Sequence, residues 1–291
     1  MEIYIVDAFT DRLFYGNPAG VVIIDSEHSI SKEVMQTIAK ELRFSETAFV
    51  RKRSDDEFVV LFFTPLSEID LCGHATVATF TVLRDKGYLV PGKAYKMHSR
   101  AGTLEIEVTE SYVMMEQTEP SMDNLDESDY EFIAQSLGIS VNDIGDKSYN
   151  LKPKVVTTGL WDLIVPVVSK QVLFSLTPDY ELISDFCRIN KLVSFHIFTL
   201  DEQKALANCR DFAPLYGIEE ESATGTANGA LAYYLFKHGV IEAEKIYKII
   251  QGESMGRISD IFVKIHFKDG VYKSYVGGSA KIFIEGSISL E

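Results

Sequence analysis

The sequence predicts an α+β fold of two similar halves, each with a mostly antiparallel, barrel-like sheet wrapped around one central helix. The main evidence is an internal repeat: segment 73–87 recurs in register at 225–239, with Gly, Ala, Ala, Leu and Gly at matching positions. The two copies lie 152 residues apart, and a period this long indicates duplicated domains rather than a solenoid. Both segments are apolar on nearly every face, which is typical of helices buried all round. Strand-like stretches flank each of them, and a curved sheet around a central helix accommodates both patterns.

In the first half, the alternation of apolar and polar residues predicts strands on both sides of the glycine-led helix. These strands are expected at 2–9, 20–24, 47–52, 58–63, 95–98, 103–108 and 112–116. A helix is expected at 31–42, because Ser31 can cap its N-terminus and Ile38 and Leu42 supply part of an apolar face.

The second half follows the same order. Helices are expected at 130–137 and 179–190, and strands at 193–199 and 204–212, before the second glycine-led helix. Residues 118–126 are acidic and poor in apolar side chains, so we expect the linker between the domains there. The second domain is therefore predicted to begin at about residue 123.

Composition and charge narrow the function classes. The chain has 291 residues, of which 46% are hydrophobic and 24% charged, as in ordinary globular proteins of two domains. Its net charge of −15 argues against a nucleic-acid partner. No apolar run is long enough to span a membrane. Three cysteines without metal-type spacing, and no signal peptide, lead us to expect a reduced, cytoplasmic protein.

The two glycine-led helices suggest where chemistry takes place. A helix N-terminus presents unpaired N–H groups and a partial positive charge, and Gly73 and Gly225 allow a ligand close to that backbone. Two such ends would bind a carboxylate or stabilise an enolate. For one glycine alone, close packing of helix on strand is the simpler explanation, but two in register favour function. We therefore expect a small anionic metabolite as the ligand.

Residues that break the repeat are candidates for catalysis. Glu46 has Phe195 as its counterpart, so the carboxylate occurs in one half only. Because Glu46 is flanked by Phe44 and Phe49, burial is expected to raise its pKa and to suit it for acid–base work. From spacing alone, an ordinary exposed strand glutamate is the simpler explanation.

Two further candidates stand at the start of the first glycine-led helix. His74 could donate a hydrogen bond to a substrate carboxylate, or could simply cap or pack the helix. Cys72 is a possible nucleophile or base, since a helix N-terminus is expected to lower a thiol pKa; a small buried residue is the simpler explanation. No second histidine or acidic residue stands near His74 at metal-ligand spacing, so no metal site is expected.

Two more segments carry weaker signals. Residues 219–221 are three glutamates before the second glycine-led helix, where one of them, such as Glu221, could reach a ligand or could simply be solvated. Asn17 lies in the sequence Asn-Pro-Ala-Gly, which is typical of a turn and offers one possible polar contact.

Several blocks together resemble the PhzF-like phenazine-biosynthesis family. They run in order over nearly the whole chain: Val6-Asp7-Ala8-Phe9, Gly16-Asn17-Pro18, Ser45-Glu46-Thr47-Ala48-Phe49, Leu71-Cys72-Gly73-His74-Ala75-Thr76, Thr224-Gly225-Thr226-Ala227, Gln251-Gly252, Gly256-Arg257 and Val276-Gly277-Gly278.

The resemblance implies a diaminopimelate epimerase-like fold with the site between two lobes. It implies that the last strands return to the first lobe, so the expected lobes are 1–122 plus 278–291, and 123–277. It also implies a cofactor-independent, usually dimeric isomerase in which a glutamate moves a proton between carbons.

The resemblance also implies the roles of individual residues. The catalytic positions map onto Glu46, His74, Glu221 and Thr226. Around these four we expect substrate contacts from Asn17, Ser45, Cys72, Gly73, Thr224 and Gly225.

Two of the four catalytic positions depart from the family pattern. Glu221 stands where the family has aspartate, and Thr226 stands where it has serine. The longer carboxylate changes the shape of the pocket, so the substrate of the phenazine enzyme is not carried over. Related racemases have a cysteine before each glycine, whereas here Cys72 is matched by Thr224. One-base chemistry at Glu46 is therefore favoured over a two-base thiol racemase. A catalytically silent binding protein and an enzyme with Cys72 as its thiol base are the alternatives.

Overall fold

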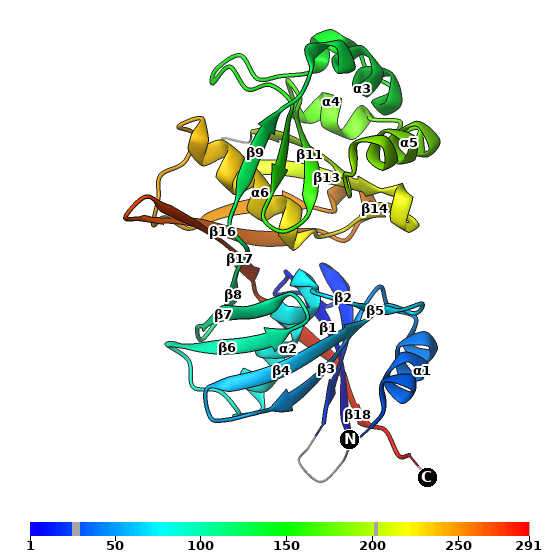
Figure 1. The fold of residues 1–291 in the computed structure, drawn as a ribbon, viewed down its shortest axis with the longest axis vertical. Helices are drawn as coiled ribbons and strands as arrows, with labels where there is room; N and C mark the ends of the chain where they lie inside the picture. The colour runs from blue at the N-terminus through cyan, green and yellow to red at the C-terminus, as the bar shows by residue number, and fades with distance from the viewer. Residues whose placement is uncertain (25–29, 201–202, 291) are drawn as a thin grey trace. The chain divides into compact units, whose positions relative to one another are not determined.

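A computed structural model describes residues 1–24, 30–200 and 203–290 (Figure 1). The chain divides into two compact units, one made of Met1–Glu116 with Gly277–Glu291, and the other of Gln117–Val276. Glu291, the last residue assigned to the first lobe from the sequence, lies outside the described residues. The predicted α+β fold of two similar halves is confirmed.

The first unit is a curved sheet with the helix α2 (Gly73–Asp85) packed against it and α1 (Lys32–Leu42) on its outer side (Figure 1). The strands are β1 (Glu2–Ala8), β2 (Asn17–Ile23), β3 (Thr47–Lys52), β4 (Glu57–Phe63), β5 (Glu68–Ile69), β6 (Lys93–Ser99), β7 (Gly102–Val108), β8 (Val113–Glu116) and β18 (Ala280–Ser287). β1 pairs antiparallel with both β18 and β2. From β2 onward the order is β2 parallel to β3, β3 antiparallel to β4, β4 parallel to β6, and β6 antiparallel to β7.

The second unit contains the helices α3 (Tyr130–Leu137), α4 (Lys170–Ser175), α5 (Tyr180–Asn190) and α6 (Gly225–Lys237). Its strands are β9 (Ser121–Asn124), β10 (Lys154–Thr157), β11 (Trp161–Pro166), β12 (Phe195–Leu200), β13 (Ala207–Ala213), β14 (Ile218–Glu221), β15 (Tyr247–Gln251), β16 (Ser259–Lys268) and β17 (Val271–Gly278), the last of which leads back to the first unit. Short 3₁₀ turns lie at Glu127–Asp129, Val141–Asp143, Pro214–Tyr216 and Glu253–Met255.

The strand pairing shows the duplication directly. In the second unit β11 runs parallel to β12, β12 antiparallel to β13, β13 parallel to β15, and β15 antiparallel to β16. This is the same alternation that β2, β3, β4, β6 and β7 follow in the first unit. In each unit the glycine-led helix comes between the third and fourth strands of this series. α2 lies between β4 and β6 along the chain, and α6 lies between β13 and β15, so the two helices occupy equivalent positions.

One sequence expectation is wrong in part. The acidic segment 118–126 was expected to be a linker, but four of its residues form β9, which pairs antiparallel with β10. Its side chains are mostly exposed, so an acidic composition is compatible with an edge strand.

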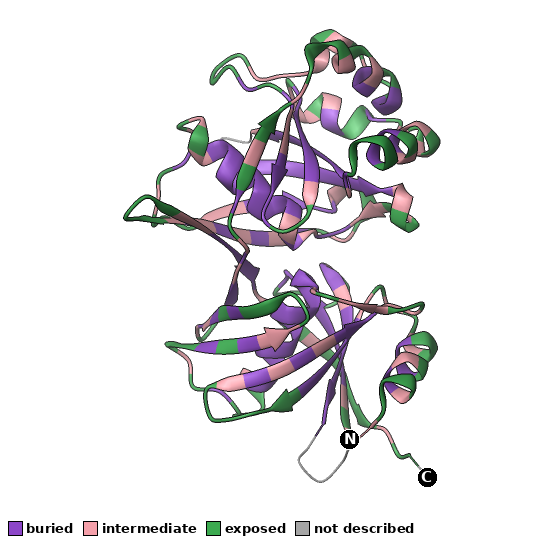
Figure 2. Ribbon diagram, in the orientation of Figure 1, coloured by how far each residue is buried: buried purple, intermediate pink, exposed green. Residues whose placement is uncertain are grey.

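The central helices are buried as their composition predicts. Every residue of α2 from Gly73 to Leu83 is buried, and α6 is buried along most of its length (Figure 2). In contrast, α1 buries only Met35, Ile38 and Ala39. Because the sheet encloses α2 and α6, their N-termini are held in fixed positions within their units.

Two glycines hold turns beside those N-termini. Gly16, with φ of +68°, precedes β2, and a Cβ atom there would lie 2.1 Å from the carbonyl oxygen of Ala8. Gly252, with φ of +79°, follows β15, and its Cβ atom would lie 2.7 Å from the carbonyl oxygen of Ser222. Glycine is therefore required at both positions, which fixes Asn17 in the first unit and Ser222 in the second.

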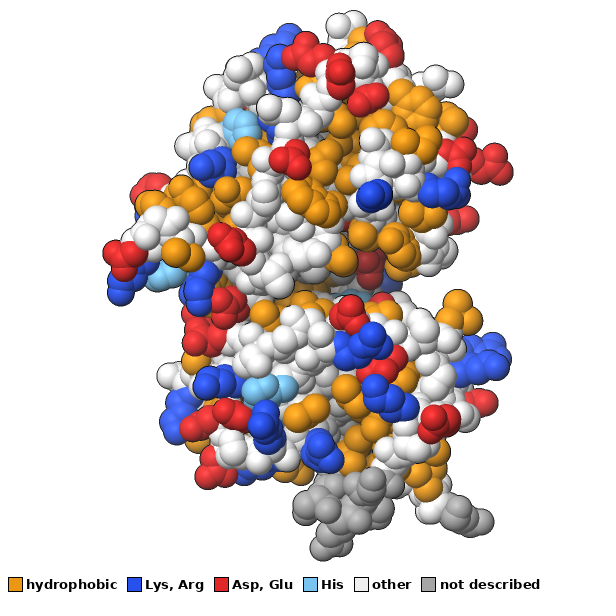
Figure 3. Space-filling model, in the orientation of Figure 1, with side chains coloured by type: hydrophobic (Ala, Val, Ile, Leu, Met, Phe, Trp, Pro, Cys, Tyr) orange, Lys and Arg blue, Asp and Glu red, His pale blue; other side chains and the backbone are white. Residues whose placement is uncertain are grey.

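The surface carries charges of both signs. Figure 3 shows Lys and Arg side chains mixed with Asp and Glu over the visible face of each unit. Among the described residues, the helices are too short or too polar to cross a membrane.

Candidate active site

The first unit brings five of the predicted site residues together around one imidazole. His74 Nε2 lies 3.0 Å from Glu46 Oε2 and 3.3 Å from Ser45 Oγ. On the other side of the ring, Nδ1 lies 3.2 Å from Asn17 Nδ2 and 3.4 Å from Cys72 Sγ. Cys72, His74 and Asn17 are all buried.

Local structure explains this convergence. Glu46 directly precedes β3, and Asn17 is the first residue of β2, which runs parallel to β3. The backbone N–H of Gly20 in β2 donates to the carbonyl oxygen of Glu46 at 3.2 Å. Since α2 packs on β2, its first turn carries His74 to the same end of the sheet.

The charges of this group differ from the sequence expectation. Burial alone would raise the pKa of Glu46, but the positive charge and hydrogen bond of His74, with hydrogen bonds from Ser45 and Cys72, lower it overall. The expectation of a raised pKa is therefore wrong, because His74, which is distant in sequence, acts together with Ser45 and Cys72 to outweigh burial. Burial would lower the pKa of His74, but Cys72 and Glu46 raise it well above its usual value. The pair is thus a carboxylate beside an imidazolium.

Cys72 also departs from expectation. Its pKa is raised to about 11, first by burial and then by the negative charge of Glu46, although His74 and the backbone N–H of Ala75 act in the opposite direction. The expected lowering by the helix N-terminus is therefore wrong. At neutral pH Cys72 is a thiol rather than a thiolate, so it is a poor base and a poor nucleophile.

The same side chains could hold a metal ion. One oxygen of Glu46, the sulfur of Cys72 and one ring nitrogen of His74 lie within 4.8 Å of one another. The sequence shows no acidic residue at metal-ligand spacing from His74, but the fold brings Glu46 close to it from another part of the unit. The expectation that His74 has no acidic neighbour is therefore wrong. A carboxylate oxygen, a cysteine sulfur and an imidazole nitrogen are all ligand types found in zinc sites.

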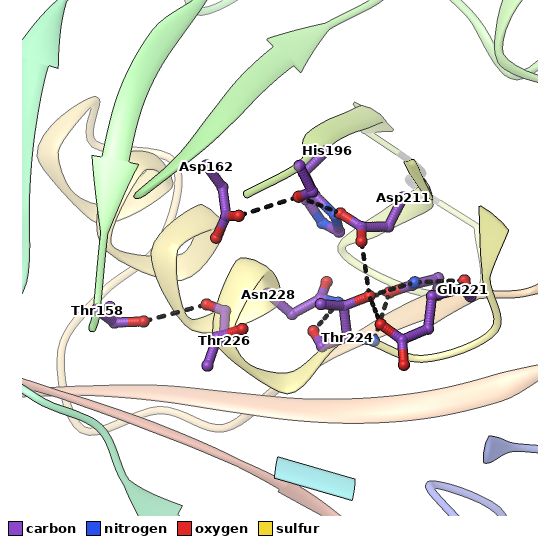
Figure 4. Close-up of polar contacts among 10 residues, drawn as sticks. Thr158, Asp162, His196, Asp211, Glu221, Thr224, Thr226 and Asn228 are labelled. Atoms are coloured by element: carbon purple, nitrogen blue, oxygen red, sulfur yellow. Dashed lines mark hydrogen bonds and ion pairs between the residues drawn. The ribbon is translucent and has the colours of Figure 1, made fainter. Parts of the chain in front are cut away.

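The second unit places Glu221 and Thr224 together before α6 (Figure 4). Thr224 Oγ1 lies 3.3 Å from Glu221 Oε2 and 3.0 Å from Asp211 Oδ2. Gln251 Nε2 donates to Thr224 Oγ1 at 3.0 Å and to the carbonyl oxygen of Glu221 at 2.8 Å. Thr226 lies in the first turn of α6, where its carbonyl oxygen accepts from Thr158 Oγ1 at 3.1 Å.

The helix N-termini themselves carry no side-chain caps. Cys72 and Thr224 occupy the N-cap positions of α2 and α6, and neither caps its helix with a side-chain hydrogen bond. No acidic residue lies in the first turn of either helix. The N–H groups beginning at Gly73 and Gly225 therefore retain the positive end of the helix dipole without a resident carboxylate in that turn.

Sequence reasoning missed a group of buried polar residues behind Thr224. Asp211 Oδ1 accepts from Ser194 Oγ at 2.8 Å and from His196 Nδ1 at 2.9 Å, and Ser194 Oγ lies 3.0 Å from Asp162 Oδ1 (Figure 4). All four residues are at most 1% exposed. The available signal was that polar residues replace apolar ones at buried positions of neighbouring strands.

Asp162 is the most perturbed acid of this group. Burial raises its pKa well above the usual value, and the neighbouring carboxyl groups of Asp211 and Glu221 add to that rise, while hydrogen bonding with Ser194 opposes it. The folded chain therefore favours the neutral, protonated form of Asp162 over its charged form.

Comparisons with known proteins cover nearly the whole chain. Residues 6–286 match the PhzC-PhzF family model, described as phenazine biosynthesis-like protein. The chain is 31% identical to the uncharacterized isomerase YfhB of Bacillus subtilis, covering 96% of this chain and 95% of that one. It is 30% identical to a trans-2,3-dihydro-3-hydroxyanthranilate isomerase of Pseudomonas chlororaphis, covering 98% of each. A crystal structure of a Bacillus anthracis PhzF family protein superposes with a TM-score of 0.88 at 30% identity, covering 100% of this chain and 99% of that one.

Proposed function

Because the chain belongs to the PhzC-PhzF family of phenazine biosynthesis-like proteins and is an isomerase, we propose that it moves a proton between two carbons of a small anionic substrate, with Glu46 as the proton carrier and without a cofactor. The observation that carries the proposal is the Glu46–His74 pair, with 3.0 Å between Oε2 and Nε2. An ionised carboxylate held in a buried polar cluster is ready to accept a proton from carbon.

The remaining roles follow from the chemistry of the intermediate. Removing a proton beside a carbonyl or along a conjugated system leaves negative charge on the substrate. The N–H groups at Gly73 and Gly225 are suited to stabilise that charge, and the imidazolium of His74 adds a positive charge. We assign Glu221 and Thr226 to holding the substrate and assisting proton transfer, as the family resemblance implies.

A solvent-isotope experiment tests the proposal. The first probe is trans-2,3-dihydro-3-hydroxyanthranilate, the compound in the name of the Pseudomonas relative, followed by other cyclic amino and hydroxy acids. In D₂O we expect one of these acids to give a rearranged product, detected by NMR and mass spectrometry, with hydrogen at the receiving carbon where Glu46 carries the substrate's own proton and deuterium there to the extent that Glu46 exchanges with solvent before delivery. Recovery of every acid unchanged and unlabelled would contradict the proposal.

Cys72→Ser separates the glutamate mechanism from a thiol-based one. With a thiol pKa of about 11, Cys72 is almost entirely protonated at neutral pH, so we expect kcat/KM to fall less than about tenfold. Steady-state rates on the acid that shows turnover provide the measurement, with Cys209→Ser in the second unit as a matched buried control. A loss as large as that of a Glu46 variant would instead identify Cys72 as the base.

A further inference from the structure

Two acidic residues face each other in the second unit. Asp211 on β13 and Glu221 on β14 are direct partners in the antiparallel register. Like charges directly opposite each other on neighbouring strands are destabilising. The hydroxyl of Thr224 lies between the two carboxyl groups, 3.0 Å from Asp211 and 3.3 Å from Glu221. A threonine hydroxyl has one hydrogen, so it can donate to only one of two carboxylates, and both contacts are satisfied when one of the acids is protonated.

The hydrogen bonds decide which of the two is ionised. Asp211 lies within hydrogen-bond distance of the hydroxyl of Ser194, the ring nitrogen Nδ1 of His196 and the hydroxyl of Thr224 (Figure 4). Several donors directed at one carboxylate favour its charged form. Asp211 is therefore the buried anion of the pair, and the proton resides on Glu221.

Counting hydrogens on Ser194 supports this assignment. A serine hydroxyl has one hydrogen to donate, yet Ser194 Oγ lies 2.8 Å from Asp211 and 3.0 Å from Asp162. Both contacts are favourable only if one acid donates to the serine oxygen. The burial of Asp162, which raises its pKa, identifies it as that donor. A chain of hydrogen bonds thus runs from Asp162 through Ser194 to Asp211.

The hydroxyl of Thr224 is subject to the same limit. It accepts from Gln251 Nε2 and has a single hydrogen for two acids. When that hydrogen is donated to the ionised Asp211, the contact with Glu221 is favourable only if Glu221 supplies the other proton. The order of donors is therefore Glu221 to Thr224 to Asp211.

We propose that Asp211 keeps Glu221 protonated through Thr224, so that Glu221 acts as a proton donor to the substrate. Asp162, Ser194 and His196 are positioning residues, because their hydrogen bonds run to Asp211, directly or through Ser194. This inference rests on the proposed function for its catalytic meaning.

The proton inventory of the step is balanced. When Glu46 takes a proton from carbon, Glu221 gives its proton to the oxygen of the substrate on which negative charge develops. When Glu46 delivers its proton to the second carbon, Glu221 takes its own proton back. The substrate is isomerised, and both glutamates return to their starting states.

Other ionisable groups around the described cluster are neutral or paired elsewhere. Burial raises the pKa of Cys187 on α5 to about 12, with added contributions from Asp162 and Asp211, and burial also raises the pKa of Cys209 on β13. Arg210, the neighbour of Asp211 along β13, forms an ion pair with Glu220 at 2.8 Å. The ionisable groups that determine where protons reside in this cluster are therefore the three acids Asp162, Asp211 and Glu221, together with His196 and the two protonated thiols.

The test follows the Glu221 carboxyl group by NMR in the intact chain labelled with ¹³C at glutamate carboxyl carbons. The signal is assigned by its loss in Glu221→Gln. We expect it to titrate at higher pH than that of the exposed Glu242. In Asp211→Asn, the acid dissociation constant of Glu221 should rise at least about tenfold, since a neighbouring charge is lost and Thr224 becomes free to donate to Glu221.

Matched variants separate the hydrogen-bond chain from general disturbance. Ser194→Ala should shift Glu221 in the same direction as Asp211→Asn. Ser274→Ala should leave it unchanged, although Ser274 is also a buried hydroxyl that donates to α6, at the carbonyl oxygen of Gly229. Thr224→Ser keeps the hydroxyl and should leave the pH midpoint of the Glu221 titration unchanged. Thr224→Val removes the hydroxyl and should move that midpoint.

The proposal is overturned if Glu221 titrates like Glu242, or if Asp211→Asn leaves its midpoint unmoved. If Asp211→Asn does not fold, the comparison of Thr224→Ser with Thr224→Val decides the same question: equal midpoints contradict the proposal. The titration needs no substrate, so it is independent of turnover. Linked titration without an isomerised product would refute the proposed function while leaving the proton linkage intact.

Discussion

Glu46→Gln should reduce kcat on the isomerised acid by roughly a hundredfold to ten-thousandfold, the range expected for losing a positioned acid–base group. Glutamine keeps the size of the side chain and can still contact the neighbours of Glu46. It cannot accept a proton from carbon. Because the change removes one charge and almost no volume, we expect the first unit to remain folded.

The measurement combines turnover with binding. Steady-state rates should collapse in Glu46→Gln, while binding of a small carboxylate such as benzoate, followed by calorimetry, should remain detectable. Glu57→Gln is the matched control, since Glu57 also contacts a histidine, with 3.1 Å between its Oε2 and His98 Nε2, but lies on β4 away from the N-terminus of α2. We expect near-normal rates for Glu57→Gln. Unchanged rates in Glu46→Gln would remove Glu46 from the role of proton carrier.

The architecture could be predicted because its signals are local or periodic. The repeat of segments 73–87 and 225–239, and their apolar character, identify two buried helices without any knowledge of strand pairing. Glycine at the first helical position then fixes where each N-terminus lies. The structure adds that both helices follow the same series of parallel and antiparallel pairings, which residue patterns alone do not specify.

The electrostatics of the site could not be predicted in the same way. A pKa depends on which charges are near in space. Next to Glu46 in the sequence stand Phe44 and Phe49, whereas His74 is far away along the chain. Once the start of β3 and the start of α2 meet, the charge and hydrogen bond of His74, with hydrogen bonds from Ser45 and Cys72, together outweigh burial and lower the pKa of Glu46. Burial and then the negative charge of Glu46 raise the pKa of Cys72, against the trend expected for a helix N-terminus.

The buried acids were missed for a related reason. Asp162 and His196 lie in largely apolar strands, but Asp211 shares β13 with Asn208 and Arg210, so the sequence of one strand alone does not show which polar side chains are buried together. Only the pairing of β11 with β12 and of β12 with β13 brings the three together. Their burial carries a cost for stability that can be measured.

Asp162→Asn should stabilise the second unit, and the gain should grow with pH. The pKa of Asp162 is raised in the folded chain by burial and by the charge of Asp211, whereas an unfolded chain has an aspartate pKa of about 4. Below pH 4 Asp162 is protonated in both the folded and the unfolded chain, so its ionisation contributes little to the free energy of unfolding. Above it, the unfolded state releases the proton while the folded state retains it, so the stability of the native sequence falls as pH rises.

The slope is set by one proton. The variant should gain about 1.4 kcal/mol in unfolding free energy relative to the native sequence for each pH unit above 4, until Asp162 ionises in the folded state. Asparagine can replace the neutral acid as a donor to Ser194, so no hydrogen bond of the chain need be lost. Urea unfolding at pH 5 and pH 7 gives the comparison, followed by fluorescence of Trp161, the one tryptophan of the chain, which lies on β11.

Asp123→Asn provides the control, because Asp123 is exposed on β9 of the same unit and its substitution should give no comparable dependence on pH. A gain that is equal at both pH values would show that Asp162 does not hold a proton above pH 5 in the folded state. A loss of stability at both values would show that its ionised form is needed. Either result would also contradict the hydrogen count on Ser194, since that count requires Asp162 to be the donor that leaves Asp211 as the anion.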